Sequence, residues 1–176
     1  MNDLFYHHFA LPFMGQWTVS QGYDGGITHK GEWGKALDFV ITAKDGKTYE
    51  QSGALPEHYY CYNKPVLCPA DGVVASITDH VEDNPVGGNN LHQNWGNTII
   101  LKHADGLYSK LSHLCKGSFK VTKGAFVKKG EVVAACGNSG RSPEPHLHFQ
   151  VQATPYVDSK TIAYPLAYYV HYNESK

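Results

Sequence analysis

The residues of this chain best suited to chemistry are His146 and His148, which are separated by one residue. The segment Leu147 to Gln152 is typical of a strand, so both imidazoles are expected on one face of a sheet. Two charged imidazoles would repel each other there, and two buried ones would each need a hydrogen-bond partner. Neutral imidazole is a good zinc ligand, and a neighbouring imidazole can act on zinc-activated water. A metal site therefore competes with a simpler interpretation, a solvated histidine pair on an edge strand.

A second cluster, His29 and Asp38, favours the metal site because it supplies the missing ligands. Catalytic zinc takes three protein ligands and leaves a fourth position for water or substrate. Those two residues and one histidine of the pair make such a set. Asp38 lies in the mostly apolar run Ala36 to Ile41, where a lone carboxylate is costly unless it is paired or metal-bound. Alternation along a half-buried strand also allows it to face solvent.

His113 is a third candidate. Alone, it would be read as a structural histidine at the end of a hairpin strand. If that strand runs beside the one that carries His146, two non-ligand imidazoles could take a proton from water and stabilise the resulting oxyanion. The other histidines lie in loops, turns or termini and are interpreted as solvated, with His103 the main exception: His7, His8, His58, His80, His92, His103 and His171.

The elements that must position these residues are strands. Short apolar or alternating runs follow one another at close intervals with turn residues between them, and helical periodicity is nearly absent. The expected fold class is therefore all-β and mainly antiparallel, a sandwich or barrel. The predicted strands are 17–21, 36–41, 65–69, 73–77, 97–102, 107–114, 126–127, 131–136 and 147–152. Two hairpins are predicted, 97–114 and 126–136.

Two long segments, 44–64 and 79–95, have no stable period and are expected to wall a groove. The turn Gly137 to Ser142 is polar and tight, and it should hold the strand that carries the histidine pair in a fixed position. The chain of 176 residues is expected to form one domain with its core at about 16–153. The tail 154–176 should pack on the sheet.

Composition excludes several function classes. The 15 basic and 16 acidic residues give a net charge of −1 without any stretch of five like charges, which argues against nucleic-acid or polybasic membrane binding. No apolar run approaches the length of a membrane span, and no signal peptide is visible. We therefore expect either a cytosolic protein or a mature domain cut from a longer precursor, which the sequence alone does not separate. We expect a monomer.

The four cysteines do not form a zinc-binding pattern, because no two are spaced as Cys-x-x-Cys. Cys68 and Cys136 lie in apolar runs, where a buried thiol acting as a small hydrophobe is the default. A disulfide between Cys61 and Cys68 is a less favoured alternative.

Taken together, these residues resemble the lysostaphin-type (LytM-type) zinc metallopeptidases, from about Gly22 to Gln152. The resemblance rests on His29 with Asp38 in Ala-Leu-Asp-Phe, on the dipeptide His113-Leu114, and on several strings in the correct order. These strings are Ala-Asp-Gly-Val-Val, Trp-Gly-Asn-Thr-Ile-Ile, Val-Lys-Lys-Gly-Glu-Val-Val and Gly-Asn-Ser-Gly-Arg-Ser-Pro-Glu-Pro-His-Leu-His-Phe.

The resemblance implies a zinc ion held by His29, Asp38 and His148, with His113 and His146 as catalytic histidines that do not bind the metal. It implies the antiparallel β fold called the duplicated hybrid motif, with a groove over the sheet. The implied activity is hydrolysis of peptide bonds in bacterial cell-wall peptidoglycan, at the cell envelope (periplasmic or extracellular).

Two positions depart from the family pattern. Eight residues separate His29 from Asp38, whereas many members have three, so the first ligand should lie on a longer bend. Many relatives also carry a tyrosine two residues before the catalytic histidine, where this chain has Leu111. An alignment on Tyr108 would place Lys110 in the catalytic position, but the His-Leu dipeptide favours His113.

Two other functions compete with a peptidase. Relatives that have lost zinc ligands act as non-catalytic activators of wall hydrolases, so a peptidoglycan-binding or hydrolase-activating module is the main alternative. A phosphocarrier is a weaker one, because Asp38 beside a phosphohistidine would add repulsion. Every expected ligand type is present, which favours an active enzyme.

Overall fold

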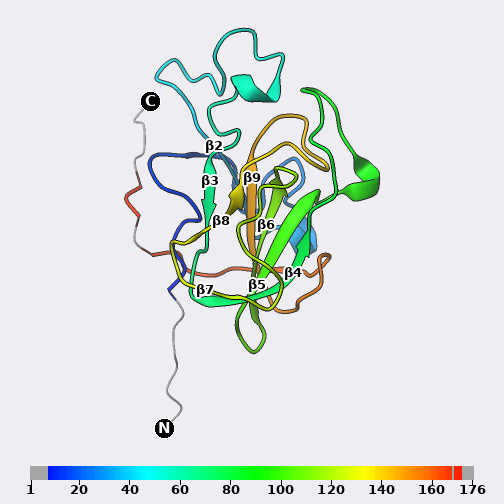
Figure 1. Cartoon of the computed structure of the whole chain (residues 1–176). Coiled ribbons are helices and arrows are strands. Elements are labelled where there is room, and N and C mark those ends of the chain that lie inside the picture. Colours follow the sequence, from blue (N-terminus) through cyan, green and yellow to red (C-terminus); the bar gives the residue numbers. More distant parts are fainter. Residues whose placement is uncertain (1–7, 168, 172–176) are drawn as a thin grey trace.

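The fold is nearly all antiparallel β-structure, as predicted from the sequence. The structure is a computed structural model that describes residues 8–167 and 169–171. Seven strands form a sheet in the order β1-β2-β9-β6-β5-β4-β7, and β10 pairs with β9 (Figure 1). The strands are β1 (Thr18–Gln21), β2 (Ala36–Val40), β3 (Pro65–Leu67), β4 (Gly72–Thr78), β5 (Asn97–Ala104), β6 (Leu107–Leu114), β7 (Phe126–Val127), β8 (Val132–Ala135), β9 (Leu147–Gln152) and β10 (Thr161–Ile162).

Alternation along β9 separates an apolar face of the sheet from a polar one. Leu147, Phe149 and Val151 belong to the hydrophobic core, whereas His148 and the two glutamines that follow at alternate positions point to the opposite side. All six residues of β9 are buried. The polar face is therefore covered by chain rather than by solvent, and each of its side chains needs a partner.

A small sheet covers the apolar face. It consists of β3 and β8, and Val66, Val133 and Ala134 from these strands join the core of the larger sheet. The predicted hairpin 126–136 is therefore wrong, because β7 pairs with β4 and β8 pairs with β3. The hairpin 97–114 is confirmed, since β5 and β6 pair along their lengths.

The long segments 44–64 and 79–95 run outside the sheets, as expected of loops, and each contains a short 3-10 turn (Figure 1). These turns are η2 (Pro56–His58) and η3 (Leu91–Gln93), and a third, η1 (Gly31–Trp33), precedes β2. Within the described residues no helix is long and apolar enough to cross a membrane.

The described part of the tail returns to the body of the protein. After β10, Leu166 forms a parallel bridge with Phe9, and the Ala167 nitrogen donates to the Phe9 carbonyl oxygen at 2.8 Å. Tyr168 and residues 172–176 of the tail, together with His7, lie outside the described residues. All four cysteines are buried free thiols, so the alternative Cys61–Cys68 disulfide is not formed.

Candidate metal centre and active site

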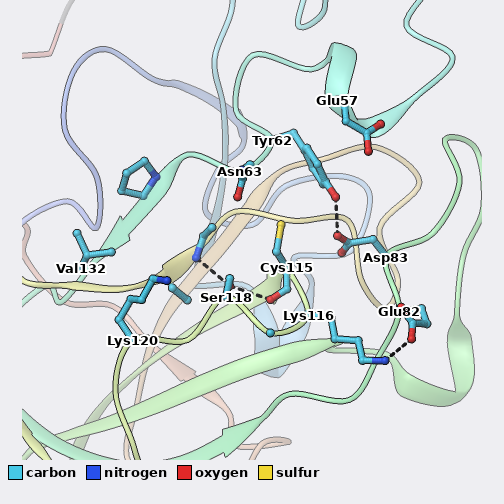
Figure 2. A pocket seen from close by; sticks show the side chains of 14 residues that line it. Glu57, Tyr62, Asn63, Glu82, Asp83, Cys115, Lys116, Ser118, Lys120 and Val132 are labelled. Atoms are coloured by element: carbon cyan, nitrogen blue, oxygen red, sulfur yellow. Dashed lines mark hydrogen bonds and ion pairs between the residues drawn. The ribbon is translucent and has the colours of Figure 1, made fainter.

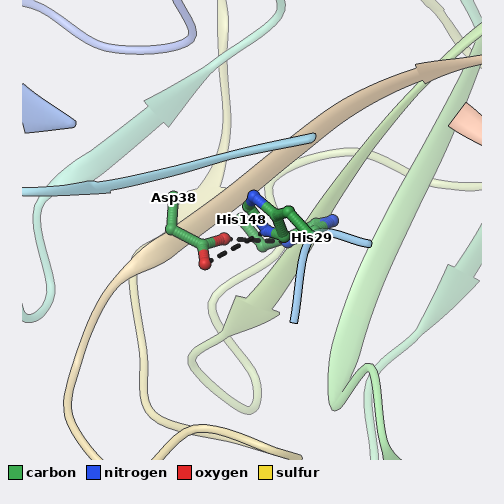
Figure 3. A group of neighbouring side chains, drawn as sticks. All are labelled: His29, Asp38 and His148. Atoms are coloured by element: carbon green, nitrogen blue, oxygen red, sulfur yellow. Dashed lines mark hydrogen bonds and ion pairs between the residues drawn. The ribbon is translucent and has the colours of Figure 1, made fainter. Parts of the chain in front are cut away.

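Two of the predicted ligands come from neighbouring strands. Asp38 of β2 lies opposite His148 of β9 in the antiparallel register, and both side chains are on the polar face. The Oδ1 atom of Asp38 lies 2.9 Å from Nδ1 of His148 (Figure 3). Asp38 is buried, so its solvent-facing interpretation is wrong. The strand alternation that places Phe39 in the core also turns the Asp38 carboxylate toward the opposite face.

The third predicted ligand, His29, lies on the long bend that precedes β2, and Gln21 of β1 shapes this bend. The Gln21 Oε1 atom accepts from the backbone nitrogens of Ile27 (3.2 Å), Thr28 (2.7 Å) and His29 (3.2 Å). Its Nε2 group donates to Asp38 Oδ2 at 2.8 Å. One side chain therefore fixes the backbone of one ligand and the carboxylate of another.

The three ligand side chains converge with their electron pairs facing inward. The His29 Nδ1–H group donates to the Gly22 carbonyl oxygen at 3.1 Å, which leaves Nε2 as the inward-facing atom. The His148 Nε2 group lies 3.0 Å from the Gln150 Oε1 atom, which leaves Nδ1 inward. These two nitrogens and an Asp38 oxygen lie within 4.8 Å of one another (Figure 3).

His29 Nε2 gives an independent test of whether this cluster fits a metal ion. It is buried and has no hydrogen-bond partner among the described residues, although Asp38 Oδ2 lies 3.2 Å away. An acceptor nitrogen that faces a carboxylate is unfavourable unless a proton or a cation lies between them. Two imidazoles and one carboxylate are a donor set suited to zinc. The cluster therefore fits a divalent metal ion.

Electrostatics within the cluster agree with this geometry. Burial would raise the pKa of Asp38, but its close contacts with His148 and His29 outweigh burial and hold it well below its usual range. Burial lowers the pKa of His148. For His29, burial lowers the pKa, but contacts with Asp38 and backbone oxygens raise it overall. Asp38 is therefore charged at neutral pH and His148 neutral, as metal ligands must be.

A β-bulge in β6 aims His113 at the cluster. Asn97 of β5 is opposite Leu114, and Ile99 is opposite Leu111, so Ser112 and His113 together face one residue. His113 accordingly has a φ of +63°, which is uncommon outside glycine. Its Nδ1–H group donates to the Ser139 carbonyl oxygen at 2.8 Å, which leaves Nε2 as an acceptor. Burial lowers the pKa of His113 well below its usual value.

His146 lies beside His113, with ring centroids 4.6 Å apart. It immediately precedes β9, so the prediction that both histidines of the pair occupy the strand holds only for His148. The His146 Nδ1–H group donates to the Glu144 carbonyl oxygen at 2.9 Å. Its Nε2 atom lies 4.0 Å from Asp38 Oδ1, at the edge of the cluster. The structure thus brings together all five predicted site residues.

All five side chains line one cavity of about 280 Å³. Segment 79–95 contributes Asn94 and Trp95 to its wall, as expected. The Trp95 ring lies 5.3 Å from that of His148, and the Lys110 ammonium packs under it at 2.9 Å from the ring centroid. Lys110 donates to the Val157 carbonyl oxygen and does not line the cavity. The alternative alignment on Tyr108 therefore places a wall-supporting residue, rather than a cavity residue, in the catalytic position.

Segment 44–64 contributes no residue to this cavity. It lines a larger one of about 830 Å³ elsewhere, where the Tyr62 hydroxyl donates to Asp83 Oδ2 at 2.8 Å (Figure 2). Glu82 and Asp83 of segment 79–95 also line this larger cavity, so the two long segments do wall one cavity, but it is not the one that the five site residues line.

His103, singled out among the remaining histidines, is held by polar partners. Its Nδ1 atom lies 2.9 Å from the Asp71 carbonyl oxygen, its Nε2 atom lies 2.8 Å from the Ser109 hydroxyl, and its ring packs edge-on against Phe9.

The sequence interpretation missed Gln21 and Gln150, whose amides contact the ligands. Their one available signal was a polar residue in or beside a strand that also carries a candidate ligand.

Comparisons with known proteins agree with the fold and show the family. The model of peptidase family M23 matches residues 59–160, a segment that contains His113, His146 and His148 but begins after His29 and Asp38. The cell division protein DipM of Caulobacter vibrioides is 34% identical over 96 residues, which cover 54% of this chain and 14% of DipM. The DD-carboxypeptidase/endopeptidase Mpg of Neisseria meningitidis serogroup B is 33% identical over 88 residues, covering 50% of this chain and 17% of Mpg.

A solved structure extends the likeness to the whole fold. A mutant catalytic domain of the prophage-encoded M23 protein EnpA from Enterococcus faecalis matches with a TM-score of 0.59 at 17% identity. The match covers 88% of this chain and 94% of that domain. The family model spans more than half of the chain, and the antiparallel fold is shared with a domain of the same family. The chain belongs to peptidase family M23.

Proposed function

We propose that this protein is a zinc-dependent endopeptidase that hydrolyses peptide bonds of bacterial peptidoglycan. The observation that carries the proposal is the convergence of His29 Nε2, His148 Nδ1 and an Asp38 oxygen in a buried cluster. Family M23 is zinc-dependent, and this donor set fits zinc. In the proposed site these three residues would hold the metal at the wall of the cavity that they line with His113 and His146.

A bound zinc ion would supply a Lewis acid that polarises the scissile carbonyl and makes an attacking water more acidic. His113 and His146 would handle the proton. Each donates its Nδ1–H group to a backbone carbonyl oxygen, so each presents Nε2 as a base. His113 is neutral because its pKa is low, and it can accept a proton from water. The protonated imidazole can then stabilise the oxyanion or deliver the proton to the leaving amine.

The proposed substrate follows from the relatives and from the cavity. The names of Mpg and of ShyA from Vibrio cholerae, another relative, describe peptidases of D,D-peptide bonds, and that of ShyA names peptidoglycan. The chain spans only 14% to 17% of the length of the curated relatives it matches, so their whole activity is not transferred. A peptidoglycan substrate would place this domain in the cell envelope.

The test combines metal analysis with digestion of purified peptidoglycan. We expect about one zinc ion per chain. Mass spectrometry of the peptide products should show the addition of one water for each bond cleaved. His148→Ala should lose zinc and activity together. Lys123→Gln, which removes an exposed charge away from the cluster, should change neither. A zinc-loaded protein that binds peptidoglycan without cleaving it would instead establish a non-catalytic binding module.

A further inference from the structure

Arg141 is a basic side chain in the wall of the cavity to which no function has been assigned. It is exposed, and its guanidinium has no hydrogen bond or ion pair within the described part of the chain. Apart from the histidines, no other basic residue among the described ones lines the cavity. A surface arginine without a partner is unremarkable elsewhere, but here it borders the proposed catalytic cluster.

The backbone that carries Arg141 is held on both sides. Its nitrogen donates to the Asn94 carbonyl oxygen at 2.8 Å. The Asn84 Nδ2 group donates to the carbonyl oxygens of Gly140 and Ser142, at 2.7 Å and 3.1 Å. A Cβ atom at Gly140, whose φ is +80°, would lie 2.4 Å from the Gly96 nitrogen, so the two segments are in close contact. Binding through Arg141 would therefore restrict only its own side chain.

The acidic side chains of the cavity wall already have polar partners within the protein. The Asp158 carboxylate accepts from Trp95 Nε1 at 2.8 Å and interacts with the charge of Lys110. Asp38 contacts His29, His148 and Gln21. A divalent ion in the cluster would make the net charge of the lining positive. The unpartnered guanidinium then faces a site suited to an anionic group.

We propose that Arg141 binds a carboxylate of the substrate close to the scissile bond. A guanidinium presents parallel N–H donors that match the two oxygens of a carboxylate. The preferred substrates are then peptides with a free carboxylate within one residue of the cleaved bond. Neutral oligoglycine bridges would be poor substrates. This inference rests on the proposed peptidase function and narrows its substrate class.

The test uses two synthetic peptides based on a bond that the zinc-loaded protein cleaves in peptidoglycan. They differ only in a free carboxylate or a carboxamide on the residue next to that bond. We expect wild-type kcat/KM to favour the carboxylate by about 10-fold or more, because hydrogen bonds between charged groups are strong. Arg141→Gln should abolish this ratio, while the matched charge-removing control Lys123→Gln should retain it. Zinc content and thermal melting verify that both variants are folded.

Two results overturn the inference: equal wild-type rates on the two peptides, or a ratio that survives in Arg141→Gln. If the wild type cleaves neither peptide nor peptidoglycan, the proposed function fails by itself. Peptides of the same design, built on a D,D-peptide bond, are then titrated into the zinc-loaded proteins by calorimetry. Tighter wild-type binding of the carboxylate, lost in Arg141→Gln, supports the role of Arg141, and equal binding of both peptides refutes it.

Discussion

The Nε2 atom of His148 lies 3.0 Å from the Oε1 atom of Gln150, two positions further along β9. Gln152, two positions further along the strand, determines which atom of this pair is the donor. The Gln152 Nε2 group donates to the carbonyl oxygens of Thr154 and Tyr156, so its Oε1 atom accepts from Gln150 Nε2 at 2.9 Å. Gln150 must then present its Oε1 atom to His148. The proton of the neutral His148 ring is therefore on Nε2, and the unprotonated Nδ1 atom faces Asp38.

We therefore predict that Gln150→Leu weakens zinc binding by about 10- to 100-fold, the usual effect of removing a group that orients a metal ligand. Gln150→Glu keeps an acceptor for His148 and should lose less affinity. Competition with a zinc chelator measures both. Gln16→Leu, a change at an exposed glutamine, is the matched control. Equal zinc affinities for Gln150→Leu and the wild type would show that the amide has no orienting role.

A second prediction concerns Gln21, which fixes the bend that carries His29. Gln21→Ala removes the acceptor of three backbone nitrogens and the donor to Asp38. Because the buried His29 nitrogen and the part-buried Ile27 and Thr28 nitrogens would lose their acceptor, we expect a loss of about 1–3 kcal/mol in the free energy of unfolding. We also expect His29 to leave the metal in part of the molecules.

Zinc X-ray absorption should then report fewer imidazole ligands for Gln21→Ala than for the wild type, and urea unfolding measures stability. The Gln16→Ala variant should change neither quantity. An unchanged imidazole count in Gln21→Ala would mean that the bend holds its shape without this side chain.

The site residues could be predicted from the sequence, whereas the residues that position them could not. A carboxylate within an apolar strand and two histidines at alternate positions are anomalies of type and spacing, and both anomalies point to a shared partner. Gln21 and Gln150 are ordinary polar residues in the sequence. Their contacts arise only when β1, β2 and β9 become neighbours.

The wrong hairpin has a related cause. The turn Lys128 to Gly130 between two apolar runs is typical of a hairpin, and local pattern alone cannot distinguish it from a crossover between sheets. Pairing of β7 with β4 and of β8 with β3 allows both layers of the core to form. The bulge at His113 could likewise not be predicted, because the sequence around it is compatible with a regular strand.

A third prediction tests His113 as a base without disturbing its backbone. Asparagine tolerates a positive φ better than most residues, so His113→Asn should preserve the bulge at φ +63°. We expect this variant to retain zinc and lose about 10²- to 10⁴-fold in kcat, the range for general acid–base catalysis. Steady-state kinetics and metal analysis on the same preparation provide the measurement. Near wild-type kcat would remove His113 from the mechanism, and loss of zinc would make it a structural residue.

The final prediction couples zinc binding to the protonation of His29. Burial lowers the pKa of His29, but Asp38 and backbone oxygens together raise it overall. Below this raised pKa the metal-free protein carries a proton on His29, which zinc must displace. Asp38 and His148 release none near neutral pH, because the pKa of each is lowered. Zinc binding should therefore release about one proton on the acid side of the His29 titration, with affinity falling about tenfold per pH unit there.

The same raised pKa fixes the sign of the stability change in the metal-free protein. The contribution of His29 is fully present below the unfolded-state pKa and is lost as the pH rises through the folded-state pKa. Calorimetry of zinc binding in two buffers with different ionisation enthalpies, at an acid and an alkaline pH, counts the protons released. Release of two protons at the acid pH would show that His148 is also protonated in the metal-free protein. Release of none would mean that His29 is neutral there and that its Nε2 atom binds zinc without competition.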